Sequence, residues 1–325
     1  MKTNMVVAGD ALELIKKVEE QSVECVYFDP PFNTNRKYRL TTEDDSVGFD
    51  DLFKSDEEYI NLIEPIVKEI KRVLSKDGSM FFHISAEQML IPHMICRKYF
   101  RRVQPIFWKR SRSKNNIKSK LGACTDIIFW CSKVDKPKFN MVYQPLDDYY
   151  AKNSYKNQDQ RGYYALGHIC YTKTQAPSRE KSPDRYYILE HNGVQYEPKY
   201  GWRMSKDDLE QLVKDDRIHF PKKPNSNPYK KIYKHESPGK PSTDYWDDVH
   251  SIAQGEQARA YPTQKPMKLL ERIILMSTEP EDVVLDPMAG SGTTGVVAKS
   301  LKRKFILFDN NPDAIRISRE RLDLK

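Results

Sequence analysis

The sequence predicts an α/β protein with a mainly parallel sheet whose strands come from both ends of the chain. Strand-like apolar runs alternate with helical patterns from residue 1 to about 135, which is typical of a parallel sheet. A strand–glycine loop–helix–strand unit occupies 282–309, and only residues 310–325 follow it. The other strands of that unit must therefore come from the N-terminal half, in a circularly permuted order. Between about 135 and 255 the alternation is lost, which indicates an inserted module.

Length and composition limit the class of protein. The 325 residues exceed the usual length of one domain and allow a large domain with an insertion. The net charge of +8 makes a polyanion a reasonable partner. Five cysteines without a C-x-x-C pair predict neither a disulfide framework nor a metal site. No apolar run approaches the roughly 20 residues that cross a bilayer, and no signal peptide is visible, so we expect a soluble cytoplasmic protein without a membrane partner.

The first strand and helix place one acidic side chain between them. Met5–Ala8 favours a strand, and apolar residues follow at helical spacing over 12–18. Asp10 either caps this helix, with Glu13 completing a capping box, or contacts a ligand. The two roles are compatible.

The second strand ends in an unusual tetrapeptide. Val23–Phe28 is a β-branched and aromatic run that predicts a buried strand. Pro30 and Pro31 end it, because neither can donate a hydrogen bond to the ladder. Asp29 is thereby held, beside Phe32, at the carboxyl edge where open α/β sheets bind ligands. The alternative is a tight turn in which Asp29 only caps a backbone group.

A polar stretch and a long helix come next. Residues 33–54 show no clear period and, placed after the strand-edge carboxylate, are a candidate mobile cover for the site. Ser55 with Glu58 predicts a helix start, and an apolar stripe runs on to a stop at Asp77–Gly78. Pro65 within it predicts a kink or a break. Further strands are expected at 79–84, 103–108 and 127–131.

The window from Arg97 to Lys120 contains many lysines and arginines and no acidic residue. A charge run is often only a solvated face. Here serine, asparagine and glycine are interleaved, which suits a flexible loop that contacts phosphates. The candidate phosphate-contacting residues are Arg110, Arg112, Lys114, Lys118 and Lys120.

The segment from about 135 to 255 differs in composition from both flanks. It is crowded with tyrosines and cations, and a helix is expected at 205–214. Aromatic side chains with cations suit nucleic acid, although tyrosines of a small mixed domain more often pack internally. We interpret the segment as an inserted substrate-recognition module.

The C-terminal unit carries an acid at the end of each of its strands. A helix should begin near Pro266, and the two strands are expected to end in Asp286 and Asp309. The loop between them fits the dinucleotide fingerprint G-x-G-x-x-G literally. Gly-Lys-Ser/Thr does not follow, so the loop is not a P-loop.

The carboxylate before the glycine loop argues against a nucleotide pyrophosphate. Asp286 would repel a pyrophosphate and suits a cationic ligand with a free amine. S-adenosylmethionine (AdoMet) satisfies this chemistry, and Asp309 could take both ribose hydroxyls. A nicotinamide cofactor is the alternative.

Three motifs in this order resemble a known family. They are DPPF at 29–32, YPTQKP at 261–266 and DPMAGSGTTG at 286–295. Together they resemble the amino-methyltransferases of DNA, specifically the permuted beta class. Met288 is one departure, because the family usually has Phe there, but Met can fill the same space.

The resemblance implies a Rossmann-like, circularly permuted AdoMet-dependent methyltransferase fold with an inserted target-recognition domain. Residues 1–135 would form the catalytic half and 258–325 the AdoMet-binding half. The target-recognition domain would occupy 136–257.

Residue roles carry over by position. Asp29 and the Pro30 carbonyl would accept hydrogen bonds from the target amino group, and Phe32, with Trp108 as a second candidate, would stack on the extruded base. The catalytic residues implied are Asp29, Pro30, Pro31 and Phe32. Asp10 would approach the adenine of the cofactor and Lys265 its carboxylate. The cofactor site implied comprises Asp10, Lys265, Asp286, Pro287, Gly290, Ser291, Gly292, Thr293 and Asp309.

The predicted activity is methyl transfer from AdoMet to N6 of adenine in double-stranded DNA, by base flipping and direct in-line attack. Asp as the first residue of the tetrapeptide favours adenine, and cytosine N4 is the alternative. Methylation at cytosine C5 needs a cysteine, typically after proline, and none of the five cysteines follows a proline. An NAD-dependent oxidoreductase and a non-catalytic DNA-binding protein are further alternatives.

The resemblance also suggests a cellular context. It implies a bacterial protein associated with the nucleoid. Relatives of this class often form dimers and often accompany a restriction endonuclease, so a second copy and a restriction–modification system are candidate partners.

Overall fold

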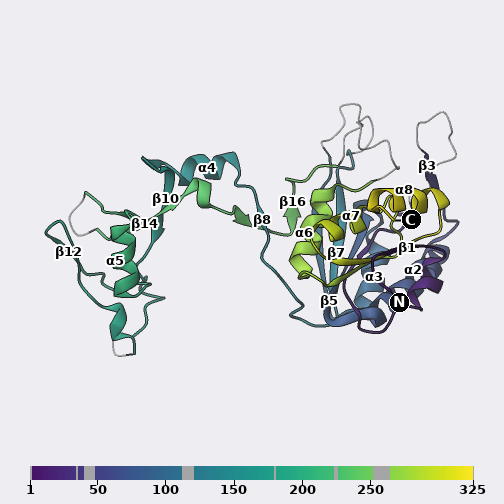
Figure 1. Cartoon of the computed structure of the whole chain (residues 1–325), viewed down its shortest axis with the longest axis horizontal. Coiled ribbons are helices and arrows are strands. Elements are labelled where there is room, and N and C mark those ends of the chain that lie inside the picture. The colour runs from purple at the N-terminus through teal and green to yellow at the C-terminus, as the bar shows by residue number, and fades with distance from the viewer. Residues whose placement is uncertain are drawn as a thin grey trace. The chain divides into compact units, whose positions relative to one another are not determined.

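The computed structural model describes residues 2–33, 36–39, 48–111, 121–178, 181–222, 226–251 and 264–324. The chain divides into two compact units, one formed by Met1–Val142 with Pro241–Lys325 and the other by Tyr143–Lys240 (Figure 1). The inserted unit begins and ends inside the predicted 136–257, because the flanking residues pack in the first unit. Trp246, for example, pairs with Trp108 in the main sheet.

The first unit contains an eight-stranded sheet. Its strands are β1 (Met5–Ala8), β2 (Val23–Phe28), β5 (Leu74–Ser85), β6 (Arg102–Lys109), β7 (Thr125–Ser132), β16 (Tyr245–Trp246), β17 (Val283–Asp286) and β18 (Lys304–Asp309). Their order is β1-β18-β17-β2-β5-β7-β6-β16. The first five pair in parallel, whereas β7 is antiparallel to both of its neighbours. The C-terminal strands β18 and β17 lie between the N-terminal strands β1 and β2. This order confirms the prediction of a circularly permuted, mainly parallel sheet.

Helices cover both faces of this sheet. They are α1 (Ala11–Ile15), α2 (Asp56–Val73), α3 (Leu90–Tyr99), α6 (Met267–Ser277), α7 (Thr293–Ser300) and α8 (Pro312–Leu322), with a 3-10 turn at Ala86–Gln88. Along β2, Val26 and Phe28 pack in the core with α1, α2 and α3, whereas Cys25 and Tyr27 pack in the core with α6 and α7. The two-residue period of a strand explains this alternation. None of the helices in the described part of the chain combines the length and apolar composition that crossing a bilayer requires.

Helix α2 differs from its prediction in two respects. Ser55 caps it as expected, its Oγ accepting a backbone N–H at 3.2 Å. The helix continues through Pro65 without the expected break and ends at Val73, before Asp77–Gly78, so β5 begins at Leu74. Six side chains of α2 are buried in the core. Their burial on both sides of the proline offsets the roughly 3 kcal/mol that an internal proline costs.

Several short elements do not follow from the sequence pattern. A two-stranded antiparallel pair, β3 (Arg36–Arg39) and β4 (Gly48–Asp51), lies within the stretch expected to be a polar loop. The sequence pattern does not predict helix α3. Its apolar residues Leu90 and Met94 are about 70% exposed, so apolar side chains are not confined to one face of the helix. Strand β16 has only two residues, too few for any periodicity.

The inserted unit has a small core of its own. Its elements are β8 (Tyr143–Gln144), α4 (Asp148–Ser154), β9 (Asn157–Asp159), β10 (Gly162–His168), β11 (Leu189–His191), β12 (Val194–Tyr196), α5 (Lys206–Lys214), β13 (Ile218–His219), β14 (Tyr229–Tyr233) and β15 (Lys240–Pro241), with 3-10 turns at Pro183–Arg185 and Lys234–Glu236. Helix α5 confirms the helix predicted at 205–214. Trp202 is completely buried, Tyr164 and Tyr233 also pack internally, and Tyr149 is 80% exposed. Tyrosines therefore occupy both of the environments considered.

We expect Ile63→Ala to lower the free energy of unfolding by about 2–5 kcal/mol, because Ile63 is fully buried between α2 and the sheet. Lys68→Ala, on the exposed side of the same helix, is the matched control and should change it by less than about 0.5 kcal/mol. Urea denaturation followed by circular dichroism measures both. Equal losses would contradict the assignment of the buried face.

Candidate active site

The carboxyl edge of the sheet brings together predicted residues from both ends of the chain. β17 pairs in parallel with β2, so Asp286, at the end of β17, and Asp29, just beyond β2, lie at the same edge. β1 pairs with β18 with Ala8 opposite Asp309, and Asp10 follows directly. In open α/β sheets this edge is the one that binds ligands.

Asp29 has one paired and one unpaired carboxylate oxygen. Its Oδ2 is paired with Nζ of Lys265, from the segment before α6. Its Oδ1 is buried and finds no hydrogen-bond partner within the described residues. Nδ1 of His83 lies 3.6 Å from this oxygen. A buried acceptor without a donor is costly, so Asp29 Oδ1 marks a position for a donor group of a ligand.

The residues after Asp29 form one wall of the site. Pro30, the next residue along the chain, is buried. The Phe32 ring is partly buried, with Lys265 Nζ 5.5 Å from its centroid. Trp108 is buried and donates its indole N–H to the Val249 carbonyl at 2.7 Å. A stacking role for Trp108 would need its buried ring to become accessible, and it stays a prediction, as does the role of Phe32.

The glycine loop between β17 and α7 is held by α8. Gly292 has a φ of 71°, and a Cβ there would lie 2.7 Å from Ser318 Oγ on α8. Arg321 Nη1, also on α8, donates to the Ser291 carbonyl at 2.7 Å and to the hydroxyls of Ser291 and Thr293 at 3.0 Å. The sequence motif does not predict either contribution of α8. Together they fix the loop backbone close to the helix.

Asp286 is a buried carboxyl group among other acids. It accepts hydrogen bonds from the Thr294 hydroxyl at 2.6 Å and the Met288 N–H at 3.1 Å. Burial raises the pKa of Asp286 to about 7, and the carboxylates of Asp29 and Asp309 push it in the same direction. A positive ligand would reverse this effect, because an opposite charge favours the ionised form.

Asp309 and Asp10 end the neighbouring strands. Each oxygen of Asp309 accepts one backbone N–H, from Gly290 at 2.8 Å and from Asn311 at 2.9 Å, and keeps further acceptor capacity. Burial raises the pKa of Asp309. Asp10 accepts the N–H of Glu13 at 3.0 Å and caps α1, as predicted. A ligand role for Asp10 stays a prediction.

A cationic ligand with hydrogen-bond donors fits this edge. The acids Asp29, Asp286 and Asp309 stand at the edge from which the glycine loop leaves, and Pro287 at the start of the loop is buried. Oε1 of Gln264 is a second buried acceptor that has no partner among the described residues. A pyrophosphate would meet like charges here, whereas an amine or a sulfonium would meet complementary ones.

The basic residues of the sequence analysis are only partly described. Arg110 Nε lies 3.0 Å from Asp126 Oδ1, and the arginine side chain is 39% exposed. Its proposed contact with phosphate is therefore compatible with the ion pair. Arg112, Lys114, Lys118 and Lys120 lie outside the described residues, as do Tyr261, Pro262 and Thr263 of the YPTQKP motif.

The sequence motifs do not include three buried polar side chains near Asp29, namely His83 and its two partners Tyr27 and Asp126. His83, in β5, is completely buried, with Tyr27 Oη 2.7 Å from its Nδ1 and Asp126 Oδ2 3.4 Å from its Nε2. Asp126 reaches this edge because β7 is antiparallel to β5, so the start of β7 lies beside the end of β5. The only signal in the sequence is a histidine inside the apolar run FFHIS.

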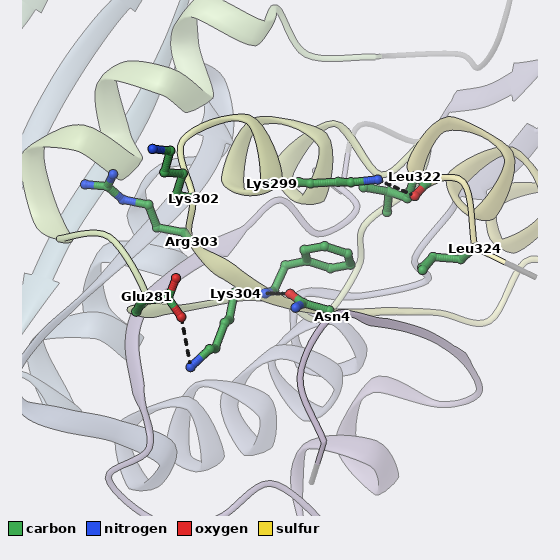
Figure 2. A pocket seen from close by; sticks show the side chains of 9 residues that line it. Asn4, Glu281, Lys299, Lys302, Arg303, Lys304, Leu322 and Leu324 are labelled. Carbon is green, nitrogen blue, oxygen red and sulfur yellow. Dashed lines mark hydrogen bonds and ion pairs between the residues drawn. The ribbon is translucent and has the colours of Figure 1, made fainter.

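A pocket in the same unit lies at the opposite edge of the sheet (Figure 2). Asn4 and Glu281, which precede β1 and β17, line it together with Lys304 at the start of β18. Lys304 Nζ lies 3.3 Å from Glu281 Oε2. Because Asp309 stands at the other end of β18, this pocket is separate from the candidate site.

Comparison with known proteins identifies relatives along most of the chain. A family model described as DNA methylase matches residues 23–320. DNA adenine methyltransferase YhdJ of Escherichia coli (strain K12) is 27% identical over 319 residues, which are 98% of this chain and 82% of that protein. Type II methyltransferase M.EcaI of Enterobacter cloacae is 26% identical over 300 residues, 90% of this chain and 63% of that protein. Type II methyltransferase M2.DpnII of Streptococcus pneumoniae is 49% identical over 85 residues, 26% of this chain and 32% of its own.

Solved structures share the fold. PvuII DNA methyltransferase (cytosine-N4-specific) is 18% identical with a TM-score of 0.54, over 99% of this chain and 86% of that one. The M1.HpyAVI–SAM complex is 17% identical with a TM-score of 0.51, over 98% and 99% of the two chains. These similarities confirm the predicted fold class.

Asp286 should make stability depend on pH. Because its pKa is about 7 in the folded protein against an ordinary 3.8, the folded state holds a proton that the unfolded chain has released between about pH 4 and pH 7. The free energy of unfolding should fall as pH rises through this window, by up to about 1.4 kcal/mol per pH unit. In Asp286→Asn this fall of the free energy of unfolding between about pH 4 and pH 7 should be absent.

Urea denaturation at a series of pH values measures the difference between wild type and Asp286→Asn. Asp135→Asn, at an exposed position, is the matched control and should follow the wild-type curve. Wild-type and Asp286→Asn curves that run parallel from about pH 4 to 7 would show that Asp286 does not titrate there.

Proposed function

We propose that this chain, which belongs to the DNA methylase family, transfers a methyl group from AdoMet to the exocyclic N6 of adenine in double-stranded DNA. The observation that carries this proposal is the unpaired Oδ1 of Asp29, which lies at the same sheet edge as Asp286 and the glycine loop. An amino group held there would stand close to a cofactor bound at that loop.

The cofactor is assigned to the glycine-loop side of the edge. AdoMet, when bound, supplies a methyl group on a positively charged sulfur. Asp286 and the loop backbone at Gly290–Thr293 would hold its methionine end, with Asp309 on the ribose hydroxyls and Asp10 near the adenine. The acidity of this edge supports a cationic cofactor.

The residues of the tetrapeptide would prepare the target amine. An exocyclic amino nitrogen is a poor nucleophile, because its lone pair is delocalised into the ring. Asp29 Oδ1 and the Pro30 carbonyl would accept its two hydrogens, so that the lone pair points at the methyl group. Oδ2 of Asp29 is already paired with Lys265, and Oδ1 can therefore serve the amine while that pair persists. Positioning of this kind supplies a large part of the rate.

Specificity for adenine is the finer part of the proposal. Asp at the first position of DPPF and the E. coli relative named as an adenine methyltransferase favour N6. Cytosine N4 is the competing product, because its amine has the same geometry. Nucleoside analysis after transfer of a labelled methyl group separates the two, and N4-methylcytosine as the labelled product would overturn the adenine assignment.

DNA contacts are proposed for both units. The basic segment 110–120 would contact phosphates, and the inserted unit would act as the target-recognition domain. Phe32 would replace the stacking that a flipped base loses. A nucleoid location, a second copy of the chain and a cognate restriction endonuclease belong to the same proposal.

We expect Asp29→Ala to retain AdoMet binding and to lose at least about 100-fold in the rate of methyl transfer, because it removes the acceptor that orients the amine. Calorimetry with AdoMet and a labelled-methyl assay measure the two properties. Asp135→Ala, exposed and distant in sequence, is the control and should match the wild type in both. Wild-type turnover in Asp29→Ala would remove Asp29 from the mechanism.

A further inference from the structure

Methyl transfer to an amine creates a proton that the enzyme must remove. As the nitrogen–carbon bond forms, the carbon–sulfur bond breaks and its electron pair stays on sulfur. The nitrogen then carries one proton too many, and losing it yields the neutral N-methyl product. Asp29 is already paired with Lys265 through Oδ2 and would contact the amine through Oδ1, so a proton left on Asp29 would stay beside the product. The site therefore needs a further acceptor.

A row of polar side chains leads from Asp29 across the sheet. His83 Nδ1 is 3.6 Å from Asp29 Oδ1, and His83 Nε2 is 3.4 Å from Asp126 Oδ2. Asp126 Oδ1 in turn lies 3.0 Å from Arg110 Nε. The row follows the strand order β2-β5-β7-β6, so each member stands on, or just beyond, the next strand.

His83 is enclosed within this row. It is completely buried, and the rings of Phe32 and Trp108 lie 5.5 Å and 5.4 Å from its own. Among the described residues, the charged and titratable groups that face it are Tyr27 from β2, Asp29 just beyond β2 and Asp126 from β7. Arg110 and Lys265 pair with the two carboxylates. A protonated ring has one N–H for each of these carboxylates, whereas a neutral ring can donate to only one of them.

We propose that His83 is the positioning residue that takes up, through Asp29, the proton lost by the target amine. The inference rests on the proposed methyl transfer. Before the reaction, His83 Nε2–H donates to Asp126 and Nδ1 accepts from the Tyr27 hydroxyl at 2.7 Å. The Tyr27 hydroxyl first turns its hydrogen away from Nδ1. The amine proton then passes to Asp29 Oδ1 and on to Nδ1, after a small rotation of the carboxyl group closes the 3.6 Å gap.

The Tyr27 hydroxyl can form a hydrogen bond with His83 Nδ1 whether the imidazole ring is neutral or protonated. Burial raises the pKa of Tyr27 well above its ordinary value, so the phenol stays protonated. A phenol both donates and accepts, and it can partner Nδ1 before and after the proton arrives. The resulting imidazolium is neutralised by Asp29 and Asp126, which keeps the accepted proton away from the product.

The first test is the pH dependence of single-turnover methyl transfer. In the wild type the rate should rise with pH as His83 becomes neutral, because only the neutral ring can accept the proton. His83→Gln should lose this rise and at least about 100-fold of the rate at high pH, with unchanged AdoMet affinity. His93→Gln, an exposed histidine on α3, is the matched control and should keep the wild-type profile. A wild-type profile in His83→Gln would overturn the proposal.

The second test needs no activity and covers a His83 variant that fails to fold. Nitrogen-15 NMR follows the ring signals of His83 through a pH titration of the wild type, Asp29→Asn and Asp126→Asn. Each substitution removes a negative charge that faces the imidazolium, so the titration midpoint should fall in both variants. An unchanged midpoint in Asp29→Asn shows that His83 and Asp29 are uncoupled, and the proposal fails. A wild type without methyl transfer to any DNA instead overturns the proposed function, and the proton path falls with it.

Discussion

The parallel pairing of β2 with β17 is the interaction on which the site depends. It joins a strand from the start of the chain to one from its end, and it sets Asp29 and Asp286 at one edge. The large separation in sequence costs little, because loop-closure entropy grows only with the logarithm of loop length. Burial of both strands on both faces of the sheet favours this pairing.

The same pairing concentrates negative charge. Asp29, Asp286 and Asp309 stand on adjacent strand ends, and burial with mutual repulsion makes Asp286 hard to ionise. Lys265 and the backbone N–H groups of the glycine loop hold these acids in place without neutralising all of them. The ligand-binding edge is therefore destabilised by itself and stabilised by a cation, a pattern expected of preorganised sites.

Local patterns explain what the sequence could predict. Asp29 and Asp286 are recognisable because proline follows each of them directly after an apolar strand, and the glycine loop follows Asp286. His83 and Asp126 are not recognisable, because their partners lie on other strands and the antiparallel direction of β7 leaves no mark on its residues. Arg321 is not recognisable from the sequence for the same reason, because its contact with the glycine loop depends on how α8 packs. The permuted and mainly parallel character of the sheet was predictable, whereas its full strand order and the contacts between elements required coordinates.

The place of the insertion has a consequence for how such a protein can change. The chain leaves the first unit after Val142 and re-enters it at Pro241, next to β16. In strand order, β16 and β6 stand at the far side of the sheet from β17 and β18, which carry the glycine loop. Mutations, deletions or exchanges within the inserted unit can therefore accumulate without disturbing the chemical centre. Evolution can rewrite the inserted unit of such a molecule while it conserves the rest.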